Sequence, residues 1–153
     1  MKIAIGADHA GYELKEKIKA RLLERGIELN DLGTVSNDSV DYPDFARLVG
    51  EEVVQKRADR GILVCGSGIG MSIAANKVHG VRAANVASEY EAQLSREHND
   101  ANVLAVGART LDEATAEAIV EKFLSTPFAG GRHQRRVDKI MQIEQEEMHK
   151  TKV

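Results

Sequence analysis

The chain has 153 residues, a length that fits one domain over residues 1–153 and leaves no room for a second. Its composition, 42% hydrophobic and 29% charged, is that of a globular protein and excludes a disordered or fibrous one. The formal net charge of -3 argues against nucleic acid as the main partner, because such binding requires an excess of Lys and Arg on one face. A small anionic ligand needs only a few local cations and is compatible with this charge.

The N-terminal segment and the cysteine content predict a cytoplasmic protein. Met1-Lys2 leads directly into Ile3-Ala4-Ile5, without the apolar core or cleavage site of a secretory signal. No apolar run approaches the roughly 18 residues of a membrane span, so we expect no membrane partner. The single cysteine, Cys65, excludes an internal disulfide and multi-cysteine metal motifs, and we expect no metal. A reducing compartment suits such a chain.

Short apolar runs alternate with longer segments of helical period. In chain order, the first half predicts a strand over 2–7, a helix over 12–25 ended by Gly26, a strand over 27–32, and a helix capped by Asp44. The apolar faces assigned to these two helices are Leu14, Ile18, Leu22 and Leu23, and Phe45, Leu48, Val49 and Val53.

The second half continues the alternation. It predicts strands over 61–65, 81–86 and 103–106, and helices over 72–77, 89–97, 112–124 and 134–149. Pro127 and Gly130-Gly131 separate the last two helices. This order predicts an α/β fold with a doubly wound five-stranded parallel sheet, strand order 2-1-3-4-5, helices on both faces and a C-terminal helix. Ligands of such sheets bind beyond the carboxyl ends of strands one and three.

The residues at these two strand ends are candidates for a functional site. Asp8-His9 follows the first strand, and Cys65 ends the third, followed by Gly66-Ser67-Gly68-Ile69-Gly70. Alternating glycines let backbone amides approach an anion, although such a loop can equally make only a tight turn. Dinucleotide-binding, hydrolase, cysteine-phosphatase and P-loop motifs each fail on a required residue. An anion-binding loop beside a thiol is what the pattern leaves.

Each polar candidate also has a structural alternative. A lone cysteine such as Cys65 is commonly a small buried hydrophobe, and His98 can simply cap a helix end. The pair Asp8-His9 can satisfy its own turn. Arg132 and Arg136, four residues apart, either clamp a phosphate or form a solvated charged face.

Together, several ordered stretches carry a resemblance to a known family. They are GADHAG at 6–11, DYPDFA at 41–46, CGSGIGMSIAANK at 65–77, QLSREHNDANVLAVGAR at 93–109 and GGRHQRRV at 130–137. From residue 2 to about 145, the chain resembles the B-type ribose-5-phosphate isomerases, whose family includes the galactose-6-phosphate isomerase subunits.

The resemblance implies an aldose-ketose isomerase without a cofactor, in which Cys65 moves a proton through a cis-enediolate. Backbone amides of the loop Gly66, Gly68, Ile69 and Gly70 would hold the oxyanion, and His98 assisted by Ser67 would open the furanose ring. Sugar hydroxyls would contact Asp8, Tyr42 and Asn99, and the phosphate would contact His9, Arg109, Arg132 and Arg136. One branch of the family has a glutamate base where this chain has Met71, which cannot take a proton. The alternatives left open are a hexose 6-phosphate substrate and a non-catalytic sugar-phosphate sensor.

The predicted topology also implies a shared active site. Cys65 leaves the carboxyl end of its strand, whereas His98 and Asn99 precede the amino end of the fifth strand. One subunit can hardly bring both groups together, so we expect a homodimer, or a tetramer built from it, with a composite site. His98, Asn99 and Arg109 are assigned to the neighbouring chain, and the subunit that supplies Arg132 and Arg136 is left undecided.

Overall fold

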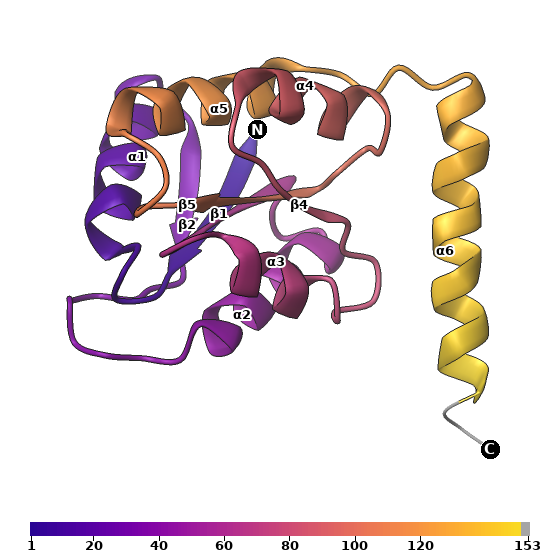
Figure 1. Cartoon of the computed structure of the whole chain (residues 1–153), viewed down its shortest axis with the longest axis horizontal. Helices are drawn as coiled ribbons and strands as arrows, with labels where there is room; N and C mark the ends of the chain where they lie inside the picture. The colour runs from indigo at the N-terminus through magenta and orange to yellow at the C-terminus, as the bar shows by residue number, and fades with distance from the viewer. Residues whose placement is uncertain (151–153) are drawn as a thin grey trace.

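Five parallel strands and six helices follow one another in the computed structural model, which describes residues 1–150 (Figure 1). The strands are β1 (Lys2–Ala7), β2 (Glu28–Asp31), β3 (Arg60–Cys65), β4 (Ala83–Asn85) and β5 (Val103–Gly107). The helices are α1 (Tyr12–Glu24), α2 (Tyr42–Val54), α3 (Ile69–Ala75), α4 (Glu89–Glu97), α5 (Glu113–Ser125) and α6 (Arg132–Lys150). The domain predicted over 1–153 ends with three residues that lie outside the described part.

Helices cover both faces of the sheet, as the strand-helix alternation predicts (Figure 1). One core cluster joins the sheet to α1, α4 and α5 through residues such as Ile18, Ala92 and Phe123. A second cluster joins the opposite face to α2 and α3 through residues such as Val49 and Met71. The prediction of a doubly wound α/β fold with a C-terminal helix is therefore confirmed.

The predicted strand order is wrong at one edge. The observed order is β2-β1-β3-β5-β4, so β5 lies between β3 and β4. Burial explains the difference, because every residue of β5 is buried, whereas the three residues of β4 are partly or fully exposed. A continuous apolar strand belongs inside a sheet covered on both faces, and a short polar one belongs at its edge. The winding still reverses between β1 and β3.

Element boundaries shift where backbone geometry was not visible in the sequence. Helix α3 begins at Ile69 rather than Ser72, directly after Gly68, whose φ of 81° is left-handed. Asp41 rather than Asp44 is the N-cap of α2. Leu23 and Leu48, expected on buried helical faces, are about half exposed at 52% and 44%.

Helix α6 lies beside the β4 edge, outside the layers of the domain, and its Glu144 accepts hydrogen bonds from the Gly80 N–H at 3.1 and 3.0 Å (Figure 1). Gly130 and Gly131 precede it with φ values of 68° and 56°, and Val137 is the one buried residue of its 19. A groove of about 800 Å³ lies between α6 and the β4 edge, with Val81, Ala84, Ile140, Ile143 and Met148 among its lining residues. None of the helices in residues 1–150, α6 included, combines the length and apolar character that a membrane crossing requires.

Candidate active site

The carboxyl ends of β1 and β3 bring Asp8 and Cys65 to one edge of the sheet. Asp8 is 6% exposed, and its Oδ1 accepts a hydrogen bond of 3.0 Å from the Gly11 N–H. The turn after β1 packs tightly on β3, because a Cβ atom on Gly11 would lie only 2.3 Å from the Val64 carbonyl oxygen. This close packing holds a carboxylate beside the end of the strand that carries the thiol.

The loop after β3 directs a backbone amide at the cysteine. Cys65 is 4% exposed, and its Sγ accepts a hydrogen bond of 3.1 Å from the Gly68 N–H. Ser67 Oγ accepts from the Ile69 N–H at 3.1 Å. An amide donor of this kind stabilises a thiolate or another developing negative charge. The predicted proximity of the thiol and the glycine loop is thus observed.

Tyr42 and His9 border the same loop. The Tyr42 ring packs on Gly70, because a Cβ atom there would lie 2.6 Å from the ring Cζ. The Nδ1 atom of His9 accepts a hydrogen bond of 3.2 Å from the Val40 N–H. When His9 is neutral, its proton therefore resides on Nε2, which leaves that nitrogen as a donor.

Arg109 lies beside the loop that follows Cys65 in its own chain, which corrects its predicted assignment to a neighbouring chain. Its N–H donates to the Gly66 carbonyl at 2.9 Å, and its guanidinium Nη1 lies 3.0 Å from the position of a Cβ on Gly66. The reason is the strand order, since β5 is hydrogen-bonded directly to β3 and Cys65 is paired with Gly107. With β4 between them, the two strand ends would have been two strand spacings apart.

His98 and Asn99 lie at the opposite edge of the sheet, as predicted. His98 is the C-cap of α4, and the chain then enters β5 at Val103, which is paired with Gly61. Along the strands, the distance from Gly61 to Cys65 is four residues, or about 13 Å at ~3.3 Å per residue. The structure of one chain thus separates His98 from Cys65.

His98 instead lies against the start of α6. Its ring stacks on that of His133, with centroids 4.2 Å apart and planes inclined by 12°. Arg132 and Arg136 flank His133 on this helix. Desolvation, followed by the nearness of His98, Arg132 and Arg136, lowers the pKa of His133 and so favours its neutral ring. His98, Arg132 and Arg136 therefore form one group, separate from Cys65.

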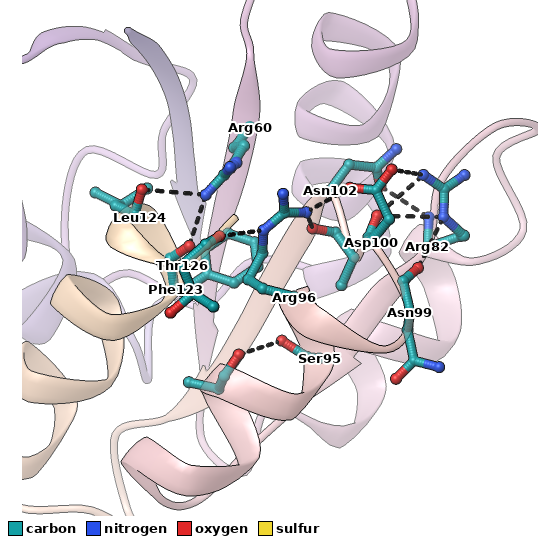
Figure 2. Close-up of polar contacts among 12 residues, drawn as sticks. Arg60, Arg82, Ser95, Arg96, Asn99, Asp100, Asn102, Phe123, Leu124 and Thr126 are labelled. Carbon is teal, nitrogen blue, oxygen red and sulfur yellow. Dashed lines mark hydrogen bonds and ion pairs between the residues drawn. The ribbon is translucent and has the colours of Figure 1, made fainter. Parts of the chain in front are cut away.

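Two arginines, Arg82 and Arg96, hold the turn that carries Asn99 and Asp100 (Figure 2). Arg96 donates to the carbonyls of Thr126 and Ala101 and to the Asp100 carboxylate. Arg82 donates through Nε to the Asn99 and Asp100 carbonyls, at 3.2 Å each. The turn that precedes β5 is therefore fixed by charged hydrogen bonds, which are stronger than neutral ones.

Arg60 completes this network at the end of α5. It donates through Nη1 to the carbonyls of Phe123 and Leu124, and burial and then the charge of Arg96 lower its pKa to about 10 (Figure 2). Cations at a helix C-terminus satisfy its last carbonyls. Arg60, Arg82 and Arg96 line a cavity of about 630 Å³, and each already donates hydrogen bonds to backbone carbonyls.

Sequence reasoning missed His133 as a neighbour of His98. The one feature of the sequence that could have indicated this contact is the position of His133 between Arg132 and Arg136 in the GGRHQRRV stretch, because the three residues lie within about one helical turn. Within residues 1–150, no group of three or more His, Cys, Asp or Glu side chains is arranged to hold a metal ion.

Comparison with known proteins agrees with this arrangement. A family model described as Ribose/Galactose Isomerase matches residues 3–140. Ribose-5-phosphate isomerase B of Escherichia coli (strain K12) is 51% identical over 144 residues, which cover 94% of this chain and 97% of the relative.

Solved structures agree over nearly the whole chain. Ribose-5-phosphate isomerase B of Clostridium thermocellum has a TM-score of 0.95 at 53% identity and covers 95% of this chain and 99% of its own. The Mycoplasma genitalium enzyme with bound ribulose 5-phosphate has a TM-score of 0.91 at 46% identity and covers 95% of this chain and 97% of its own. The family resemblance of the sequence motifs is thus confirmed, and this chain belongs to the ribose/galactose isomerase family.

Proposed function

We propose that this protein interconverts ribose 5-phosphate and ribulose 5-phosphate, with Cys65 as the base. The observation that carries the proposal is the Cys65 thiol, at the carboxyl end of β3, in contact with the Gly68 amide. As a thiolate, Cys65 takes the C2 proton of the open-chain aldose and gives a cis-enediolate. Return of a proton to C1, with transfer of the O2 hydroxyl proton to O1, gives the ketose. The reaction has no net gain or loss of electrons or protons.

The other site residues divide into those that bind and those that open the ring. Amides of the loop from Gly66 to Gly70 stabilise the enediolate oxygen. His98, with Ser67, opens the furanose ring by moving a proton between the ring oxygen and the C1 hydroxyl. Sugar hydroxyls bind to Asp8, Tyr42 and Asn99, and the phosphate binds to His9, Arg109, Arg132 and Arg136.

We further propose that two chains build each site. Cys65 lies at the carboxyl ends of the strands and His98 at their amino ends. A two-fold partner can bring the amino ends of one sheet to the carboxyl ends of the other. Because Arg132 and Arg136 flank His133, which stacks on His98, they come from the same chain as His98. Large exposed apolar residues supply contact area, among them Ile69, Ile73, Tyr90, Ile140 and Ile143.

Two further expectations belong to this proposal. The chain acts as a single domain without a metal or cofactor, and it works in the cytoplasm, where its one free thiol stays reduced. Dimers of this kind can pair into tetramers without changing the site.

A turnover assay tests the proposal. Ribose 5-phosphate should be isomerised faster than galactose 6-phosphate or allose 6-phosphate, and a chelator should not change the rate. Cys65→Ala should lose nearly all turnover yet still bind ribose 5-phosphate, because the loop amides and cations remain. Full activity of this variant, or loss of wild-type activity with chelator, contradicts the mechanism. Binding without turnover of any of the three sugars indicates a sensor.

A further inference from the structure

We infer that His133 is a positioning residue, whose ring holds the imidazole of His98 in the orientation that opens the furanose ring. The inference rests on the proposed role of His98 as the ring-opening group. It concerns a residue that does not itself need to touch the sugar.

The stack is the contact that orients the His98 ring. A functional histidine is commonly oriented by a hydrogen bond from its second ring nitrogen. Among residues 1–150, neither ring nitrogen of His98 has a hydrogen-bonding partner, whereas its face lies 4.2 Å from His133 at 12°. A face contact fixes the plane of the ring and leaves both nitrogens, at its edge, available to the substrate.

The backbone places His133 where this contact can persist. The Ala129 N–H donates to the Glu97 carbonyl at 3.1 Å, which ties the segment before α6 to the end of α4. The His133 N–H donates to the Gly130 carbonyl at 3.0 Å, which closes the first turn of α6. The two imidazoles thus lie at the end of α4 and the start of α6, and a backbone hydrogen bond at Glu97, the residue before His98, connects α4 to the segment that leads into α6.

The charges around His133 favour a neutral ring. The titratable and charged groups that face it are His98, Arg132, Arg136 and Glu97. Burial and then the nearness of His98, Arg132 and Arg136 lower the pKa of His133 by more than Glu97 raises it. A neutral aromatic face stabilises a cation stacked on it. His133 can therefore support the protonated form of His98 that arises when the sugar hydroxyl gives up its proton.

Substrate chemistry separates this role from a general structural one. Ribose 5-phosphate exists mainly as a furanose and must be opened before Cys65 can act. Ribulose 5-phosphate has no free hydroxyl at C5, so it is already open-chain. A loss confined to ring opening therefore lowers kcat from the aldose, whose bound furanose waits to be opened. It spares kcat from the ketose, because the open-chain aldose that forms can leave the site and close its ring in solution.

The experiment compares His133→Ala, His133→Phe, His98→Asn and the matched control Arg135→Ala on the full chain. Initial rates are measured from ribose 5-phosphate and from ribulose 5-phosphate. We expect His133→Ala to lose about 10- to 100-fold in kcat from the aldose, because misorientation of an acid-base group costs this much. No variant can change the equilibrium constant, so the ratio of kcat/KM in the two directions must stay at its wild-type value. The KM for the aldose should therefore fall together with its kcat, while kcat and KM for the ketose stay within about threefold of wild type. His133→Phe, which can still stack, and Arg135→Ala should keep both rates.

The controls distinguish failure of this inference from failure of the proposed function. Equal losses in both directions for His133→Ala, an unchanged aldose rate, or no recovery with Phe would each overturn the positioning role. If His98→Asn keeps the aldose rate, the proposed ring-opening role of His98 is itself wrong. If His98→Asn loses the aldose rate while His133→Ala does not, the inference about His133 alone is refuted.

Discussion

The guanidinium of Arg109 lies 3.0 Å from the point that a Cβ atom on Gly66 would occupy. This contact links the end of β5 to the residue after Cys65 and places a cation at the proposed phosphate site. A methyl group on Gly66 would therefore require the Arg109 guanidinium to shift by a few tenths of an ångström.

We expect Gly66→Ala to raise KM for ribose 5-phosphate by about tenfold, because a charged hydrogen bond contributes roughly 1.5 kcal/mol or more. Arg109→Ala should have a similar effect. If Gly66 acts through Arg109, adding Gly66→Ala to Arg109→Ala should raise KM no further. Additive effects in steady-state kinetics of the double variant would show that Gly66 acts independently.

Arg132 and Arg136 should bind the phosphate group. Replacement of either by Ala is expected to raise KM by one to two orders of magnitude, from roughly 1.5–3 kcal/mol per charged hydrogen bond lost. Arg135 is the matched control, because it is an exposed arginine of the same helical turn. An unchanged KM in both variants would return these arginines to a solvated charged face.

Mixing two inactive proteins tests whether the site is shared. Cys65→Ala and His98→Asn subunits, dissociated reversibly and reassociated in equal amounts, should recover about a quarter of wild-type activity. Half of the dimers are then mixed, and each has one intact and one doubly defective site. No recovery, with mixed dimers verified by mass spectrometry of tagged subunits, would place both residues in the same chain's site.

The Lys15–Asp31 ion pair should make stability depend on pH. Lys15 is 1% exposed, and its Nζ lies 2.8 Å from Asp31 Oδ2. Burial alone would raise the pKa of Asp31, but hydrogen bonds from Lys15, Lys19 and the Gly33 N–H lower it overall. The folded state therefore favours the carboxylate, and its contribution is present above the ordinary pKa of 3.8 and lost as pH falls through the lower folded value.

We accordingly expect Asp31→Asn to lower the free energy of unfolding by about 3 kcal/mol at pH 7, because Lys15 keeps its charge without its main partner. The difference from wild type should shrink as pH falls below about 4. Glu113→Gln, which breaks an exposed pair with Lys17, should change stability by less than about 1 kcal/mol. Urea denaturation at several pH values measures all three proteins, and a pH-independent difference would contradict the assigned cause.

Local sequence patterns were sufficient to predict the layers and the position of Cys65. The apolar strands ending at Ala7 and Cys65 and the intervening helical segments imply a parallel sheet, and their order places Asp8 beside the thiol. The lateral order of β4 and β5 was not predictable from alternation alone, because it depends on which of the two strands is polar enough to be exposed at the edge of the sheet. Compared side by side, the buried VLAVG of β5 and the polar end of β4 carry that information.

Contacts between side chains were harder to predict than strand ends. The stack of His98 on His133 joins residues 35 positions apart, and two left-handed glycines, Gly130 and Gly131, set the direction of the chain just before His133. Similarly, Arg96 reaches the carbonyl of Thr126, a pairing that no local periodicity encodes. Such contacts depend on the angle at which consecutive helices meet.

The central position of β5 has a consequence for communication between sites. In the proposed dimer, one β5 strand connects residues of two sites. Arg109, after the carboxyl end of β5, belongs to the site that contains Cys65 of the same chain. His98 and Asn99, before the amino end of β5, belong to the site that contains Cys65 of the other chain. The five residues of β5 span about 13 Å at ~3.3 Å per residue, and they lie between segments that contribute to two different sites. Every one of these residues is buried, and a close-packed interior leaves little room for one residue to move without its neighbours. A displacement of Arg109 by bound phosphate would thus reach the ring-opening group of the second centre along a single strand.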